Sequence, residues 1–291
     1  MCLSQALAAA VSGLRASQAG LSIVSANVAN AQTPGYVRKT AVQVTASAGD
    51  FGAGVRVAAV NRALDSYVQR QLRIESSGAS YADLRAQFYE RLQNVYGVPG
   101  SDSTLETAFN KFTSSLQALS TSPDSAAARG GVLSSAQMLT LQLNSMTADI
   151  QGLRQDAELG LADAASRAND AMTRLVQINQ QLGATTANDA ATANLLDQRD
   201  RYLDQLAQLM DINVVEGNRH QVAVSTNSGI QLVGNAAATL VFDPRGSIGA
   251  TSQWSADPTK RSVGTLILSD PNGGSIDLIA SKSIRSGEIA A

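Results

Sequence analysis

A heptad repeat that runs unbroken through the middle of the chain limits its fold more than any other feature. Within the region 126–183, apolar residues recur seven positions apart at Ala136, Leu143, Ile150, Ala157, Ala164, Ala171 and Ile178. Such a repeat is typical of a helix that packs lengthwise against other helices. One helix of this span would be about 85 Å long at about 1.5 Å per residue. The sequence therefore predicts an elongated body, which Gly152 and Gly160 could bend or divide.

The composition agrees with long helices packed closely side by side. The 291 residues are 44% hydrophobic, much of it Ala, but only 4% aromatic and 16% charged. A net charge of −2 argues against a general nucleic-acid binder and against a polybasic membrane-surface protein. One cysteine, Cys2, and one histidine, His220, exclude a disulfide framework, a multi-Cys metal site and the HExxH motif. We expect neither a cofactor nor a metal ion.

The first 31 residues form a second, almost uncharged heptad segment, whose single charge is Arg15. Its stripe consists of Leu7, Leu14, Leu21 and Val28. Gly13 and Gly20 each cost about 1 kcal/mol relative to Ala inside a helix, so the helix is marginal in water on its own. We expect it to become ordered on a partner helix outside its own chain. The alternative, an ordinary amphipathic helix on its own domain, predicts more charge on the outer face.

Membrane insertion and a cleaved signal are not expected for this N-terminal segment. Polar residues interrupt it throughout, at Ser4, Gln5, Ser12, Ser17, Gln18, Ser25 and Asn27. The first ten residues lack the basic start and apolar stretch of a cleaved secretory signal. Any export would therefore use a route that reads an uncleaved N-terminus.

The rest of the chain divides by its periodicity. Pro34-Gly35 ends the first helix in a type II turn, so the first region is 1–36. Alternating valines predict a hairpin or extended arm over 37–61. Helical spacing then covers 62–211, where Ser103-Thr-Leu-Glu106 reads as a capping box. Strand alternation covers 212–291. We therefore predict a mainly α fold with an elongated long-helix domain and a small β-rich C-terminal part.

Few ionisable residues could carry chemistry. The densest group is Asp197, Arg199, Asp200, Arg201 and Asp204. It could be a catalytic carboxylate pair or a metal cluster. The interleaved arginines at helical spacing favour a solvated, salt-bridged helix face instead. His220 lies in a turn and is expected to be exposed, and Cys2 lies too near the terminus to be held as a nucleophile. We predict no catalytic residues and no enzymatic activity.

One segment, Ser25-Ala-Asn-Val-Ala-Asn-Ala-Gln-Thr-Pro-Gly-Tyr-Val-Arg38, resembles the N-terminal signature of bacterial flagellar axial proteins. Its signature turn comprises Asn27, Asn30, Thr33, Pro34, Gly35, Tyr36 and Arg38. The long helical section, followed by Asn194-Leu-Leu-Asp-Gln-Arg-Asp-Arg-Tyr-Leu203 and Val214-Val-Glu-Gly217, is similar to the hook-associated protein 1 family. The resemblance covers about residues 3–245, whereas 246–291 match only loosely, as in a variable outer domain.

The resemblance implies a structural, non-enzymatic subunit at the hook–filament junction, outside the cell, needed for filament assembly and motility. Its terminal helices would self-associate in the axial tube, with Leu7, Leu14, Leu21 and Val28 at the interface. The implied partners are further copies of the chain, the hook protein, the third hook-associated protein, the type III export apparatus and an export chaperone. Tyr36 and Arg38 would either fix the turn or contact a neighbouring subunit.

One departure and two alternatives accompany the resemblance. Members of the family end in a second heptad helix that pairs with the first, and no such helix follows residue 245. We therefore expect an N-terminal portion of a longer protein. A distal rod or hook subunit would have a β-dominated body where this chain has the repeat at 126–183. A secreted cell-wall hydrolase fused to an axial-protein start would need a carboxylate pair in a cleft, which the sequence does not place.

Overall fold

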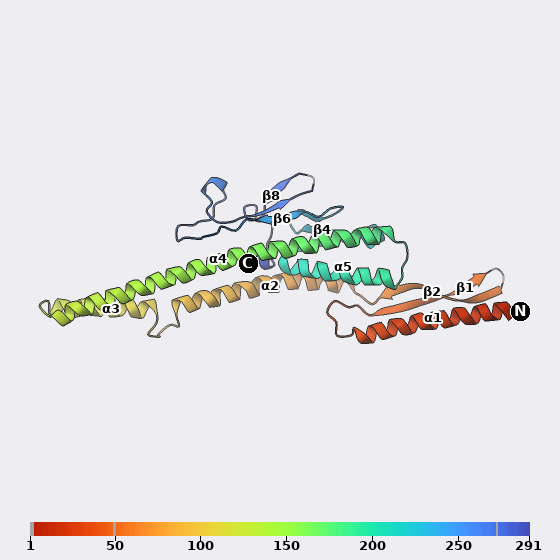
Figure 1. Cartoon of the computed structure of the whole chain (residues 1–291), viewed down its shortest axis with the longest axis horizontal. Helices are drawn as coiled ribbons and strands as arrows, with labels where there is room; N and C mark the ends of the chain where they lie inside the picture. The colour runs from red at the N-terminus through yellow and green to blue at the C-terminus, as the bar shows by residue number, and fades with distance from the viewer. Residues whose placement is uncertain (1–2, 49–50, 272) are drawn as a thin grey trace.

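The chain forms an elongated molecule with one helix running along most of its length (Figure 1). The computed structural model describes residues 3–48, 51–271 and 273–291. Helices α2, α3 and α5 lie beside α4, small sheets cover one side, and a hairpin with α1 forms one end. This mainly helical fold with a β-rich C-terminal part is the predicted one.

Helix α1 (Leu3–Ala29) packs on a hairpin of β1 (Lys39–Ala48) and β2 (Phe51–Arg62). The strands are antiparallel, with Lys39 opposite Arg62. The helix uses a face of small residues in which Ala16 is buried. Its Ser12 hydroxyl accepts a hydrogen bond from the Val55 N–H at 3.1 Å. The expectation that α1 has no partner within its own chain is therefore wrong, because the hairpin covers one of its faces.

The expectation that α1 does not insert into a membrane stays a prediction. By length and composition alone, the stretch Ala6–Ala29 is apolar enough to cross a membrane, despite its polar residues. Only 11% of its most apolar window is buried within the chain. The helix therefore leaves most of its apolar surface uncovered by the rest of the described chain.

Helices α2 (Ser66–Tyr96), α3 (Leu105–Thr121) and α5 (Ala190–Leu209) begin at side-chain caps. Gly97 ends α2 with a φ of 82°, a backbone conformation that glycine adopts without a steric penalty. The capping box predicted at Ser103 is wrong by one residue. Thr104 is the cap of α3, and its hydroxyl accepts a hydrogen bond from the Thr107 N–H at 3.2 Å. Thr107, with a hydroxyl of its own in the same network, occupies the position expected for Glu106.

Helix α4 (Ala126–Ala184) confirms the heptad prediction as one continuous element of 59 residues. Gly152 and Gly160 lie inside it without dividing it. Its first half packs mainly on α3, which has no buried residue among those described. Its second half lies in the core, where Ala168, Met172 and Leu175 are fully buried.

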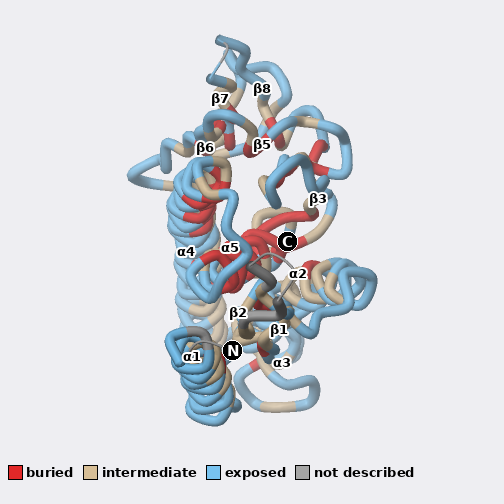
Figure 2. The backbone as a smooth tube through the Cα atoms, turned by 90° about the vertical axis from the view of Figure 1, so that its right-hand side faces the viewer, coloured by how far each residue is buried: buried red, intermediate tan, exposed pale blue. Residues whose placement is uncertain are grey.

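Two three-stranded antiparallel sheets follow α5. The first contains β3 (Ile212–Glu216), β4 (Val222–Thr226) and β5 (Gln231–Val233) in that order. The second contains β6 (Thr239–Phe242), β7 (Leu266–Ser269) and β8 (Ser275–Asp277). Their inner faces pack with α5 and the second half of α4 in the main core, which Figure 2 shows as the buried centre of the molecule.

The chain segment near residue 291 lies against the helices and not at an end of the molecule (Figure 1). The last short helical turn, Glu288–Ala290, contacts α2, α4 and α5. Just before it, the Gly287 N–H donates to the Ser77 carbonyl of α2 at 3.0 Å. The elements agree with the periodicity of the sequence, while the division into regions 1–36, 37–61, 62–211 and 212–291 stays a prediction.

Candidate functional site

The predicted interface residues lie on the face of α1 that points away from the hairpin. Leu7, Leu14, Leu21 and Val28 are 65%, 60%, 69% and 73% exposed, respectively. Leu3 and Val24 extend the same exposed surface. Helix α1 thus has two distinct faces, a small-residue face on the hairpin and an apolar face in solvent. We call the exposed set Leu7, Leu14, Leu21 and Val28 the leucine stripe.

The signature turn is organised around Asn27. Its side-chain nitrogen donates to the Lys39 carbonyl at 2.8 Å, and its side-chain oxygen accepts from the Lys39 N–H at 2.9 Å. The same oxygen accepts the Tyr36 hydroxyl at 3.0 Å. One side chain therefore joins the end of α1 to the start of β1 and closes the loop between them.

The remaining signature residues complete this loop. The Tyr36 N–H donates to the Thr33 carbonyl at 3.1 Å, and Gly35 between them has a φ of 76°, as a type II turn with Pro34 requires. The side-chain nitrogen and the backbone N–H of Asn30 both donate to the Ala26 carbonyl at 3.0 Å, directly after the last residue of the helix, Ala29.

Tyr36 and Arg38 have different environments. The half-buried Tyr36 fixes the turn through Asn27, and burial, with the nearby charge of Asp197, raises its pKa. Arg38 is exposed, and its side chain forms no hydrogen bond or ion pair within the described ranges. Its carbonyl accepts the Ala63 N–H at 2.8 Å.

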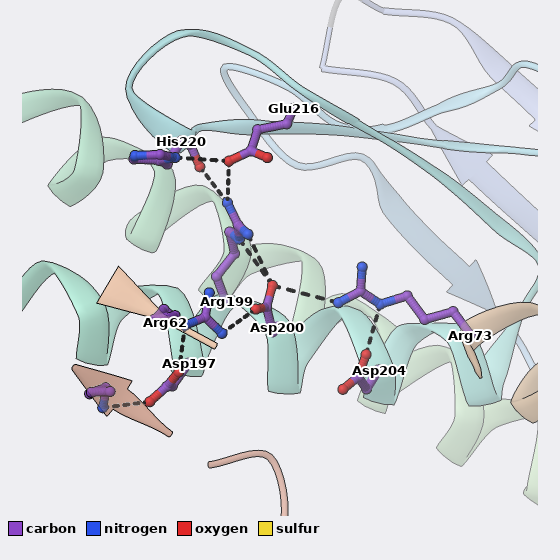
Figure 3. A network of polar contacts seen from close by, with 9 residues as sticks. Arg62, Arg73, Asp197, Arg199, Asp200, Asp204, Glu216 and His220 are labelled. Carbon is purple, nitrogen blue, oxygen red and sulfur yellow. Dashed lines mark hydrogen bonds and ion pairs between the residues drawn. The ribbon is translucent and has the colours of Figure 1, made fainter. Parts of the chain in front are cut away.

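The open end of the hairpin is held on α5 by ion pairs (Figure 3). The Lys39 ammonium lies 2.6 Å from Asp197 Oδ2 and also donates to the Asn194 side chain at 2.6 Å. Arg62 Nε lies 2.8 Å from Asp197 Oδ1, and Arg62 Nη2 lies 2.5 Å from Asp200 Oδ2. Asp197 thus binds the first residue of β1 and the last residue of β2.

The network continues to α2 and β3. Arg73 of α2 binds Asp204 with an Nε to Oδ1 distance of 2.7 Å. Arg199 lies 3.1 Å from Asp200 Oδ1 and 3.3 Å from Glu216 Oε1, and it donates to the His220 carbonyl at 2.7 Å. We call the whole network the ionic anchor. It contains four cations and four carboxylates: Lys39, Arg62, Arg73, Arg199, Asp197, Asp200, Asp204 and Glu216.

The ionic anchor corrects the prediction of a solvated helix face. The ion pairing is present, but Asp197, Arg199 and Asp200 are only 5%, 7% and 3% exposed. Asp204 is partly exposed, and Arg201 is exposed as expected. The reason is that the hairpin, α2 and β3 cover α5 on several sides. Sequence reasoning missed Lys39, Asn194, Arg62, Arg73 and Glu216 as members, because their spacing along the chain gives no sign that they meet.

Two carboxyl groups of the ionic anchor differ in their electrostatics. Burial alone raises the pKa of Asp200, but the positive charges of Arg199, Arg62 and Arg73 outweigh it and lower the pKa below its ordinary value. Burial raises the pKa of Asp204, because Arg73 offsets it only in part and Asp200 adds repulsion. Asp200 therefore stabilises the network as an anion, whereas the charge of Asp204 is disfavoured.

The ion pairs of the ionic anchor hold structural elements together. All four carboxylates of the ionic anchor are held by cations, so they form no open catalytic pair. Among residues 3–48, 51–271 and 273–291, no group of three His, Cys, Asp or Glu side chains could hold a metal ion. His220 is exposed and pairs with Glu216 at 3.0 Å, and Cys2 lies outside the described residues. The geometry fixes the direction of α1 relative to α5.

Comparison with known proteins places these features in one family. The model of the flagellar hook-associated protein FlgK helical domain matches residues 89–291, and that of the flagella basal body rod protein matches residues 7–36. The first match corrects the expectation that 246–291 belong to a variable outer domain, because it extends to residue 291. The second covers the leucine stripe and most of the signature turn.

Individual relatives agree with the family models. Flagellar hook-associated protein 1 of Escherichia coli (strain K12) is 29% identical over 292 residues, which cover 96% of this chain and 50% of that protein. Its counterpart in Bacillus subtilis (strain 168) is 30% identical over 213 residues, which cover 69% of this chain and 42% of that protein. The chain thus spans about half the length of the curated relatives it matches.

A solved structure has the same fold. The flagellar hook junction protein FlgK from Burkholderia pseudomallei superimposes with a TM-score of 0.63 and 26% identity, over 76% of this chain and 38% of that one. The long helices, the small sheets and the family models therefore lead to one assignment: the chain belongs to the FlgK family of flagellar hook-associated proteins.

Proposed function

We propose that this chain belongs to a structural subunit of the hook–filament junction in the bacterial flagellum. It acts by assembly and not by catalysis. Its family membership and the names of its relatives support the location. The leucine stripe is the observation that carries the mechanism, because α1 presents it to solvent while its other face is held on the hairpin.

Burial of the leucine stripe against other copies supplies the driving force. A Leu or Val side chain contributes about 1.5–3 kcal/mol when it is fully buried. Each stripe residue is at least 60% exposed in the isolated chain, so most of this free energy is still available for association. The ionic anchor contributes by fixing the direction of α1, which lowers the conformational entropy lost when the stripe docks.

The proposed partners follow from the location. They are further copies of the chain, the hook protein on one side and the third hook-associated protein on the other. Delivery would use the type III export apparatus and an export chaperone, and the protein would keep its N-terminal segment. N-terminal sequencing of the protein recovered from purified flagella tests the last point, since loss of the stretch before Ala29 would contradict it.

The central experiment places charge in the leucine stripe of the full-length protein. Leu14→Asp with Leu21→Asp should abolish junction assembly in a strain that lacks the native protein, because two carboxylates would enter an apolar interface. The matched control is Ala8→Asp with Ser22→Asp, which adds the same charge to exposed positions on the flank of α1 beside Arg15. The readouts are filament number by electron microscopy and the amount of protein exported to the medium.

Each outcome has a defined meaning. Normal export with no filaments for the stripe variant, and filaments for the control, supports the proposal. Normal filaments with the stripe variant contradict it. Gold labelling at the rod or along the hook shaft, and not at the junction, would favour the alternative of a rod or hook subunit. Turnover of purified cell wall by the protein would overturn the non-enzymatic assignment.

A further inference from the structure

A groove of about 500 Å³ lies between β3 and the start of α2. One wall is the edge of β3, with Ile212, Val214 and Glu216. The other wall is α2, with Arg70 and Arg73, and Arg199 of α5 lies in the floor. The groove is separate from the leucine stripe, which is on α1.

The β3 wall presents unused backbone hydrogen-bonding groups. Strand β3 is an edge strand and pairs only with β4 in its sheet. In the pairing of β3 with β4, Glu216 lies opposite Val222. The next pair is Gly217 and Gln221, in which the Gly217 N–H donates to the Gln221 carbonyl at 2.7 Å. Antiparallel alternation then directs the N–H and C=O of Val214 away from β4. Within the described residues, no loop or side chain forms a hydrogen bond to these groups of Val214.

The α2 wall carries two arginines, Arg73 of the ionic anchor and Arg70 outside it. Arg73 is nine-tenths buried, and its Nη2 makes no hydrogen bond, lying 3.6 Å from Asp200 Oδ1. In Figure 3 its other amino group points away from both Asp200 and Asp204. Arg70 is exposed, and the described part of the chain offers it no ion pair. Since the anchor balances four cations with four carboxylates, Arg70 gives the groove an excess of positive charge.

We propose that this groove binds an extended, carboxylate-bearing segment of another polypeptide chain. The segment adds a strand to β3 through the outward backbone groups around Val214. Its acidic side chain lies against Arg70 and Arg73. In such strand addition the main-chain hydrogen bonds supply affinity, and the side-chain contacts supply specificity. The inference goes beyond the proposed function, because it requires neither the leucine stripe nor flagellar assembly.

The test uses the isolated 291-residue chain and a blocked synthetic hexapeptide of alternating Val and Glu. Titration followed by nuclear magnetic resonance should shift the amide signals of Val214 and Glu216 and the Nε–H signal of Arg73. The same peptide with Gln in place of Glu should bind about tenfold more weakly, since it loses the charge-assisted hydrogen bonds. No shift in β3, or equal binding of the two peptides, overturns the proposal.

Two variants separate the backbone and charge contributions. Arg70→Glu should weaken binding of the Glu peptide by at least about tenfold. The control Arg174→Glu reverses a charge on an exposed face of α4 outside the groove and should bind as the unsubstituted chain does. Val214→Pro removes an N–H that β4 does not use, as edge strands tolerate, and should abolish binding.

The outcomes distinguish this inference from the proposed function. Unchanged binding by both Arg70→Glu and Val214→Pro overturns it. If thermal unfolding shows that Val214→Pro does not fold, the comparison of peptide binding by Arg70→Glu and by Arg174→Glu still tests the proposal. The chain with Leu14→Asp and Leu21→Asp should bind the peptide normally. Failure of the assembly experiment would therefore not affect the outcome of the peptide-binding test.

Discussion

At the residue scale, single side chains fix the geometry of the N-terminal region. Asn27 joins α1 to β1, and Asp197 joins both strands of the hairpin, at its open end, to α5. The signature turn could be predicted because Pro34-Gly35 has a local conformational preference. The ionic anchor could not, because Lys39 and Asp197 are far apart in sequence and a charged helix face looks the same whether water or protein covers it.

The two carboxylates Asp200 and Asp204 should respond differently to neutralisation. Asp200→Asn should destabilise the chain by about 3–5 kcal/mol, because it leaves Arg62 and Arg199 buried with too little opposing charge. Asp204→Asn should cost less than about 1 kcal/mol, since Asp204 is partly exposed and its charge is already disfavoured. Urea unfolding at neutral pH measures both. An equal loss of unfolding free energy in the two variants would contradict the different roles assigned to Asp200 and Asp204.

The same residues should give opposite pH dependences. Because the folded pKa of Asp200 is lowered, its contribution to stability is present above its unfolded pKa of about 3.9 and is lost as the pH falls through the folded pKa. Because the folded pKa of Asp204 is raised, its contribution is present below about 3.9 and is lost as the pH rises through the folded pKa.

This dependence can be measured as the free energy of unfolding between about pH 7 and about pH 3. The difference in unfolding free energy between the unsubstituted chain and Asp200→Asn should decrease as the pH falls. Its stability relative to Asp204→Asn should improve over the same range. Parallel curves for the two variants would show that the two carboxyl groups are equivalent and would contradict this account.

At the element scale, periodicity predicted the helices well and their partners poorly. The spacing of seven in α4 was readable from the sequence. The cap of α3 was misplaced by one residue, because Ser103 and Thr104 are equally suitable cap residues. The small-residue face of α1 was missed as a packing surface, since Ala, Ser and Gly carry little hydrophobic signal beside a stripe of Leu.

Close packing of α1 on the hairpin makes a prediction about Gly54. Its φ is 150°, and a Cβ at this position would lie 2.3 Å from the Ser12 hydroxyl oxygen. Gly54→Ala should therefore loosen the contact and raise hydrogen exchange in α1. Gly152→Ala is the matched control in α4, where nothing lies within 4 Å of the added Cβ. It should stabilise the helix by about 1 kcal/mol and leave α1 unchanged. Unchanged exchange in the Gly54 variant would contradict the packing described.

At the scale of the whole molecule, the core and the proposed assembly surface are at different places. The main core joins the second half of α4 to α5 and the two sheets, whereas α1 lies with the hairpin at one end (Figure 1). The ionic anchor connects these two parts, together with a small apolar cluster of Ile23, Val60 and Ala193. The sequence could predict an elongated helical body, but not this arrangement, because it depends on contacts between segments distant in sequence.

The most direct test of the central claim is the solvent accessibility of the leucine stripe before and after assembly. In the full-length protein with Cys2 and any further native cysteine replaced by Ser, a single Leu14→Cys or Leu21→Cys reports accessibility through its rate of reaction with a maleimide. Arg174→Cys on α4 serves as the control for the reagent. The account predicts fast labelling of the stripe cysteines in the free subunit and strong protection in purified hook–filament structures. Equally fast labelling in both states would contradict it.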